Sequence, residues 1–397
     1  MSDGTLQTLD VTMLDDVNNA SGLVQLDSNA KIPACSGAAI TGLSSITKNA
    51  SDPVITTNPS GGVGTVWQNT TSGEMYICTD ATAGENVWIN VGAGSGDVEP
   101  WELGRTNYGW TAGHYSSGYY ANINKYSFTS DGNATDAGDL SRTKVYVAAA
   151  SSITHGYCAG GVHGSPQDEK SDMVEKFAFA SDGNGIDTTQ DLIEASNPTG
   201  CNSETYGYTM GGHTNASNNV DHVWKYAFDS TANATDVGNL TVGRYANSNS
   251  SSSSAAYGYM HGGSAEPSVM QHEVIDKFSF SSDGDAADVG DLTFVTSNPH
   301  GASSSTYGHC MGGYSPSAVT NVISRYSFAS DGNAVDWGDL TVARHGSSSS
   351  SATTHGYCTG GVSTTDVIDK FPYASSSGST DVGNLVTGGY GQGGHQS

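Results

Sequence analysis

Acidic, aromatic and imidazole side chains are the residues of this sequence whose types and spacing suit chemistry. The chain of 397 residues has 40 Asp and Glu, 20 Tyr and 12 His, but only 14 Lys and Arg. Grouped carboxylate oxygens are the ligands that Ca²⁺ prefers, and pairs of carboxylates are the catalytic groups of most glycoside hydrolases. Tyrosine and histidine on loops suit ligand recognition by stacking and hydrogen bonding.

Carboxylates cluster in a polar turn that recurs along the chain. Its richest copies contain Asp283, Asp285, Asp288 and Asp291 in one case and Asp331, Asp336 and Asp339 in another. Other copies lose carboxylates, as at Ser377 and Asn384, and the spacing is not that of an EF-hand loop. We interpret these segments as structural turns and expect no cofactor, with Ca²⁺ at the Asp-rich turns as the alternative.

We expect that the protein is not an enzyme. The Asp-box pattern of sialidases, S-x-D-x-G-x-[TS]-W, is absent. His155 and His355 stand where four other copies of the repeat have Tyr, which favours packing over metal binding. A catalytic pair among the 40 acidic residues stays open, so a glycan depolymerase is kept as an alternative.

A basic residue precedes an aromatic pair in each copy of the repeat. These residues are Lys125, Lys176, Lys225, Lys277, Arg325 and Lys370. We expect each to form an ion pair with the Asp of the Asp-Leu step in its own or a neighbouring copy, and we keep a ring of ligand-binding cations as the alternative.

The loops that differ most between copies are the candidate binding surface, because variable loops on a rigid scaffold commonly carry binding function. Their tyrosines are expected to stack on sugar rings; plain solvent-facing loops are the alternative. The candidate ligand-binding residues are Tyr115, Tyr119, Tyr120, His163, His213, Arg244, His272, Tyr314, Arg344 and His345.

A repeat of about 50 residues must position these side chains. Its leading glycine recurs at residues 109, 156, 207, 258, 308 and 356, so the differences are 47, 51, 51, 50 and 48. Each copy continues with a second glycine or glycine pair, two aromatic residues at period two, a polar turn and a Leu. Several short strands per repeat with a glycine pair indicate a β-propeller of six blades.

The strand order within one copy follows from side-chain size. Serine runs such as Ser248–Ser254 and Ser347–Ser351 recur in register, so we place them on the innermost strand, where blades converge. The aromatic strand is expected to fill the space between blades. The first copy has too few residues before Gly109 for an inner strand, so the tail from Tyr390 to Ser397 is expected to supply it and close the ring.

The order of small-residue strand, aromatic-Gly strand ending in Gly-Gly, aromatic strand and Leu strand resembles the kelch repeat over about 300 residues. The Trp usual before the last kelch strand is missing, and Gly-Asp-Leu stands there. The expected fold class is all-β: a six-bladed kelch-like β-propeller with an N-terminal attachment segment and a small β module.

The N-terminal part lacks the repeat. Its run SGLVQLDSNAKIPACSGAAITGL, Ser21 to Leu43, resembles a segment of tailed-phage fibre proteins. We divide the chain into a virion-attachment segment (1–45), a small β module with linker (46–98) and the propeller (99–397). The resemblance implies a virion fibre or spike that binds a host-surface glycan or protein, contacts other virion proteins through residues 1–45 and forms a homotrimer. A neck or capsid decoration fibre without a receptor is the other alternative.

Charge and cysteine content limit the partners further. A net charge of −26 disfavours nucleic acid and anionic membranes. The N-terminus has no basic and apolar signal segment, so synthesis in the host cytoplasm and location in the virion are expected. Cys158, Cys310 and Cys358 share one repeat position, too far apart on different sheets for disulfides, and are expected to be buried filler.

Overall fold

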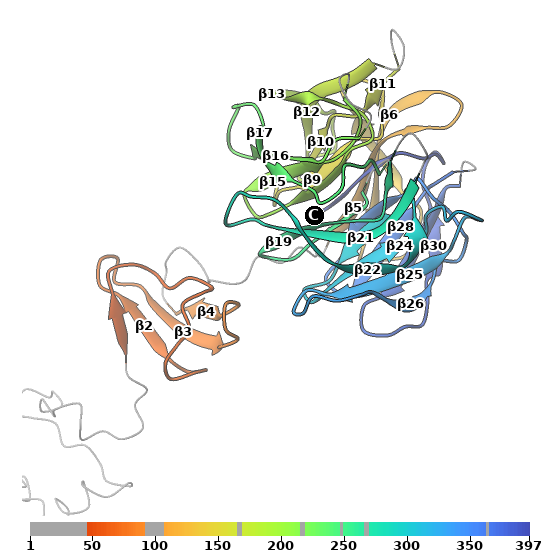
Figure 1. The fold of residues 1–397 in the computed structure, drawn as a ribbon. Coiled ribbons are helices and arrows are strands. Elements are labelled where there is room, and N and C mark those ends of the chain that lie inside the picture. Colours follow the sequence, from red (N-terminus) through yellow and green to blue (C-terminus); the bar gives the residue numbers. More distant parts are fainter. Residues whose placement is uncertain are drawn as a thin grey trace, which may run out of the picture. The chain divides into compact units, whose positions relative to one another are not determined.

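The computed structural model describes residues 46–91, 107–164, 169–214, 219–246, 249–265, 270–362 and 365–397, apart from the side chains of residues 193, 194 and 270. The chain divides into two units, residues 1–100 and 101–397. The described residues are all-β, as expected (Figure 1). They contain no helix, and so none long and apolar enough to cross a membrane.

The first unit contains one four-stranded sheet in the order β1-β2-β3-β4. Its strands are β1 (Thr47–Asn49), β2 (Val66–Asn69), β3 (Met75–Asp80) and β4 (Val87–Asn90). The predicted sheet is present, but the buried face carries Trp67, Tyr76, Cys78 and Trp88. The residues whose alternation predicted it, among them Met75 and Ile77, are only half-buried on the other face, because the bulky aromatic rings form the core.

The second unit contains six sheets, each with a four-stranded antiparallel core. In pairing order, the core strands are β31 (Gly393–Gln396), β5 (Tyr108–Tyr115), β6 (Tyr119–Ser127) and β7 (Thr135–Asp139) in sheet 1; β9 (Ala148–Ser151), β10 (His155–Ala159), β12 (Glu169–Ala178) and β13 (Ile186–Ala195) in sheet 2; β14 (Thr199–Asn202), β15 (Tyr206–Met210), β16 (His222–Ala227) and β17 (Thr235–Asn239) in sheet 3; β18 (Ser251–Ser253), β19 (Tyr257–His261), β21 (Met270–Ser279) and β22 (Ala287–Thr296) in sheet 4; β23 (His300–Ser303), β24 (Tyr307–Met311), β25 (Val322–Ser327) and β26 (Val335–Asp339) in sheet 5; and β27 (Ser348–Ser351), β28 (His355–Thr359), β29 (Val367–Pro372) and β30 (Thr380–Asn384) in sheet 6. Short strands β8 (Lys144–Val145) and β11 (Val162–His163) extend sheet 2, and β20 (Ser264–Ala265) extends sheet 4.

Hydrogen bonds link the first strands of the six sheets in a cycle. The strands approach so closely that a Cβ on Gly394 would lie 2.0 Å from the Ser349 oxygen and one on Gly200 would lie 2.5 Å from the Ala149 oxygen. The predicted placement of small residues on these strands is confirmed, because larger side chains do not fit. The linking bonds, taken around the cycle, are Ser151 N–H to Asn202 Oδ1, Ser251 Oγ–H to Gly200 O, Ser253 N–H to Ser303 Oγ, Ser303 N–H to Ser351 Oγ, Ser350 Oγ–H to His395 O and Gln396 N–H to Ser151 Oγ.

The C-terminal tail supplies the first strand of sheet 1, as predicted. Strand β31 pairs antiparallel with β5, and His395 lies opposite Trp110. The His395 ring is fully buried between sheets, where its Nδ1 lies 3.0 Å from the Ala150 oxygen. Figure 1 shows the C-terminus beside β9 and β5. The tail therefore covers two sheets that would otherwise each have an open edge.

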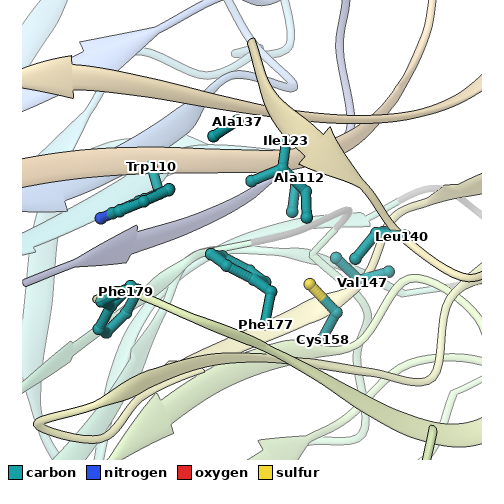
Figure 2. Close-up of a cluster of buried hydrophobic side chains, with 9 residues drawn as sticks. All are labelled: Trp110, Ala112, Ile123, Ala137, Leu140, Val147, Cys158, Phe177 and Phe179. Carbon is teal, nitrogen blue, oxygen red and sulfur yellow. The ribbon is translucent and has the colours of Figure 1, made fainter. Parts of the chain in front are cut away.

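Aromatic residues of each third strand fill the space beside the second strand of the preceding sheet, as predicted. Figure 2 shows one such cluster, in which Phe177 and Phe179 of sheet 2 face Trp110 of sheet 1 at ring-centroid distances of 5.7 and 5.4 Å. The inner ring of each pair also lies across the repeat's leading glycine; a Cβ on Gly156 would be 2.5 Å from the Phe177 ring. The leading glycine is thus required by this contact.

Buried histidines make the second unit sensitive to acid. His309 stands where Tyr occupies four of the other sheets, stacked 4.9 Å from Tyr373. Burial, and next the positive charge of Arg325, lower the pKa of His309 to about 3. Burial likewise lowers the pKa of His395 to about 4. Both rings are neutral when folded, so the unfolded chain binds more protons below its pKa of about 6.5.

Truncation tests the closure by the tail. Deleting Gly389–Ser397 removes the first strand of sheet 1 and exposes edges of two sheets, so we expect a lower melting temperature and aggregation. Gly394→Ala tests the same contact with one carbon and should cost about 1–3 kcal/mol by overpacking. Gly183→Ala is the control, since nothing lies within 4 Å of a Cβ there. Unchanged melting and monodispersity of the truncated protein would disprove the closure.

Replacing a buried histidine tests the acid sensitivity. Stability should be complete above pH 6.5 and fall as the pH drops toward 3, by up to about 1.4 kcal/mol per pH unit for each such histidine. His309→Tyr restores the residue of the other sheets, so its melting temperature should fall less between pH 6.5 and 4.5. Tyr357→His, at the equivalent position of sheet 6, should fall more. Equal slopes for wild type and both variants would contradict this origin.

Candidate functional site

The ring of basic residues is tied to turns of the following sheet. Each Lys reaches the Asp of the next sheet's Asp-Gly turn, so the expectation of a neighbouring partner is confirmed and that of the Asp-Leu step is wrong. The pairs are Lys125–Asp182 at 2.9 Å, Lys225–Asp283 at 2.7 Å, Lys277–Asp331 at 2.8 Å and Lys370–Asp131 at 2.9 Å. Their Asp side chains are more than half exposed, so each pair contributes at most about 1 kcal/mol.

The Asp-rich turns also tie neighbouring sheets together through backbone groups. Asn184 Oδ1 accepts the Asp139 N–H at 3.1 Å, and Asp285 Oδ1 accepts the Asn239 N–H at 2.9 Å. Within the described ranges, no three His, Cys, Asp or Glu residues are grouped so that they could hold a metal ion. The turns thus have a structural role that needs no ion.

Arg244 and Arg344 do not belong to the candidate binding surface. Both are buried, at 0 % and 1 % exposure. Arg244 Nη1 donates to Asp276 Oδ2 at 2.7 Å, and Arg344 Nη2 donates to Asp369 Oδ2. Each Asp belongs to the next sheet, so the arginines hold sheet 3 to sheet 4 and sheet 5 to sheet 6.

A third buried pair shows that the sheets alternate. Lys144 and Glu175 join sheet 1 to sheet 2, with 3.8 Å between Nζ and Oε1 and no exposure. Burial lowers the pKa of Lys144, and Glu175 opposes this shift. The basic residues of the three pairs are 100 residues apart, at 144, 244 and 344. The structural unit is therefore a pair of sheets that occurs three times.

Tyrosines from three distant segments gather where the loops between second and third strands meet the C-terminal tail. We call Tyr115, Tyr119, Tyr146 and Tyr390 the tyrosine cluster. The ring centroids of Tyr115 lie 5.2 Å from Tyr119 and 5.4 Å from Tyr390, and those of Tyr146 and Tyr390 lie 6.1 Å apart. All four side chains are half-buried, so each ring is held on one side and reaches solvent on the other.

Backbone contacts hold the tyrosine cluster in place. The β5–β6 hairpin carries two of the rings, and Tyr115 exchanges two backbone hydrogen bonds with Tyr390, of 2.9 and 3.0 Å. Tyr146 has a positive φ of 58° and donates its N–H to Gly391 O at 2.7 Å. Burial, and next the neighbouring Tyr390, raise the pKa of Tyr146, so its phenol stays protonated at neutral pH.

The aromatic surface continues from the cluster toward sheet 5. A Cβ on Gly346 would lie 3.4 Å from the Tyr390 Cβ, and His345 precedes this glycine. His345 in turn lies 5.8 Å from Tyr314, which is 42 % exposed. Thus Tyr115, Tyr119, Tyr314 and His345, four of the candidates, lie on or next to one aromatic surface.

The remaining candidates lie elsewhere or point differently. Tyr120 stacks on the buried His114 at 4.6 Å, on the other side of the strand from Tyr119. His213 packs 4.1 Å from Tyr245 at the connection between sheets 3 and 4. His163 is buried and lies 3.7 Å from Glu169. His272 is half-buried in β21, where burial first and Arg244 next lower its pKa.

Sequence reasoning missed Tyr146 and Tyr390. A signal for Tyr390 was present, because a tail that completes sheet 1 must pass the end of β5. Tyr146 gave a weaker signal: it follows Lys144 at the sheet connection where Tyr245 and His345 follow the two arginines.

No protein-family model matches the chain, and no curated protein matches it.

Breaking a buried ion pair tests its structural role. Arg344→Met leaves Asp369 buried without its cation and should cost about 3–5 kcal/mol in the free energy of unfolding. Arg344→Met combined with Asp369→Leu removes both charges and should recover most of that stability. Arg142→Met, in the loop before Lys144, is the control. Denaturant titration measures the differences; an Arg344→Met protein as stable as wild type would contradict the assignment.

Proposed function

We propose that the second unit is a six-bladed kelch-like β-propeller that binds a glycan of a host-cell surface through the tyrosine cluster, and that the chain is a fibre or spike protein of a tailed-phage virion. No catalytic step belongs to this proposal. The observation that carries it is the assembly of four half-buried tyrosines from three segments at one place on the loop surface.

Two features support the propeller part of the proposal. The first strands are joined in a hydrogen-bonded cycle that returns to sheet 1 through the C-terminal tail. Each sheet also packs its aromatic pair on the second strand of the preceding sheet. Blades arranged in this way leave the loops at one end of the strands free to vary without loss of core.

The glycan part of the proposal rests on the chemistry of tyrosine. A half-buried phenol ring presents an apolar face on which the C–H face of a sugar can stack, and its hydroxyl group forms hydrogen bonds with sugar hydroxyls. Because packing fixes the rings before binding, little side-chain entropy is lost when a ligand is bound.

The virion part of the proposal comes from the N-terminal sequence. The fibre-like run and the rest of residues 1–45 lie outside the described residues, so the attachment role and the homotrimer stay predictions. The half-buried apolar residues on the second face of the N-terminal sheet, such as Met75 and Ile77, favour association, since a four-stranded sheet of this size has a small core.

Removing two rings of the cluster tests the binding site. Tyr115→Ala with Tyr119→Ala should weaken binding to host cells or to an array of their surface glycans by roughly tenfold or more, since binding hot spots contribute over 1 kcal/mol each. The melting temperature should change little, because these rings lie outside the sheet core.

Tyr257→Ala is the matched control, since this tyrosine is 37 % exposed and lies at the opposite end of the second strand of sheet 4. Undiminished binding by the double variant, or loss of binding by the Tyr257→Ala variant, would refute the proposed site.

A further inference from the structure

The chain itself shows which ligand the basic ring takes. At four boundaries between sheets, a Lys ammonium binds an Asp carboxylate of the next sheet at 2.7–2.9 Å. At the two remaining boundaries, Thr231 and Ser376 occupy the position of that Asp. These two boundaries lack the intramolecular carboxylate, and they differ in what has replaced it.

The boundary between sheets 5 and 6 is compensated. Its basic residue is Arg325, whose guanidinium carbon lies 4.1 Å from the centre of the Tyr307 ring and 3.4 Å from that of Trp337. Trp337 stands where the other sheets have smaller residues. Stacking on two aromatic rings thus replaces the ion pair.

The boundary between sheets 2 and 3 keeps a lysine and has no such replacement. Among the described residues, Lys176 takes part in no ion pair and no cation–π contact. A hollow of about 290 Å³ opens beside it, lined by Lys176 together with Ser152, Ile153, Thr154, His155, Tyr157, Glu204, Thr205, Phe228 and Asp229. This volume is at the small end of the range for ligand sites.

The boundary between sheets 6 and 1 is a filled twin of this hollow. Tyr157 stacks on Phe228 at 4.6 Å and 28°, and Tyr357 stacks on Phe128 at 4.7 Å and 26°. His155 and His355 lead the two second strands and receive the same 2.8 Å contact from the preceding Thr. In the twin, Asp131 occupies Lys370.

The lining of the open hollow specifies the rest of the ligand. Glu204 and Asp229 carry negative charge into it, so a ligand must offer hydrogen-bond donors there, away from its own carboxylate. Ile153, Tyr157 and Phe228 give an apolar wall. Burial, and next Lys176, lower the pKa of His155, so the ring is neutral at pH 7 and Lys176 supplies the positive charge.

We propose that this hollow between sheets 2 and 3 binds a sugar acid, with the sugar carboxylate on Lys176, its hydroxyls donating to Glu204 and Asp229, and its ring against Tyr157 and Ile153. A single monosaccharide unit suits the volume. The hollow is built from the turns between first and second strands and between third and fourth strands. These turns lie at the opposite end of the strands from the tyrosine cluster, so this site is independent of the proposed function.

The test compares three probes on the full-length protein by saturation-transfer NMR and calorimetry at about 0.15 M salt, where the net negative charge is screened beyond about 8 Å. Sodium glucuronate should bind, and glucose and acetate should bind at least tenfold more weakly, since each lacks part of the recognised chemistry. Thr231→Asp with Ala232→Gly restores the Asp-Gly turn and should reduce glucuronate binding at least tenfold. Lys176→Met should do the same. Thr231 is exposed, so the first variant should melt no lower than wild type.

A matched variant opens the twin. Asp131→Thr vacates Lys370 where Thr129 stands in place of Asp229, so it should gain no glucuronate site of equal affinity. The proposal is overturned if glucuronate does not bind, if binding survives in the restored-turn variant, or if acetate binds as well as glucuronate. Equal glucuronate binding at the twin in the Asp131→Thr variant would refute the role of Glu204 and Asp229.

Discussion

The close approach of six first strands around one centre determines most of this structure. Backbone oxygens of one strand lie where a Cβ of the next would stand, as at Gly394 and Gly301. Only Gly, Ala and Ser tolerate this approach, and the serine hydroxyls then satisfy the polar groups that become buried. Because these strands contain almost no apolar bulk, the hydrophobic core must lie farther out, between the sheets. The aromatic residues of the third strands supply it.

The outer core has its own matching constraint. Each large ring of the third strand lies on the leading glycine of the second strand and then packs on the preceding sheet, as Phe371 does on Gly356 and His309. A ring and a glycine thus specify each other across one strand pair, while a ring and a second-strand aromatic residue specify neighbouring sheets. These contacts explain why the repeat is visible in the sequence although its polar residues vary.

The sequence predicted features that depend on contacts within one repeat. The strand order, the aromatic pair and the first strand donated by the tail all follow from local side-chain size and from counting residues. It did not predict which Asp meets each Lys, because that depends on how far one sheet is displaced against the next. It also suggested that Arg244 and Arg344 face solvent, since charged residues are rarely buried unless paired. Their partners, Asp276 and Asp369, lie in the following repeat. The interval of 100 residues between Lys144, Arg244 and Arg344 was visible, but its meaning required the alternating sheets. In the N-terminal sheet, alternation gave the strands but not the buried face.

Departures from a regular repeat separate structural from functional residues. A position that loses a stabilising contact and gains another has been rebuilt for packing, as where Arg325 and Trp337 replace a Lys–Asp pair. A position that loses the contact and gains none has given up stability without a structural return. Lys176 is of the second kind, and so is the tyrosine cluster, where aromatic rings lie half in solvent instead of in the core. Both lie at ends of the strands, where the sheet pairing no longer fixes the side chains. In a scaffold whose interior permits so few substitutions, these strand ends are where the six copies can differ and where binding specificity can arise.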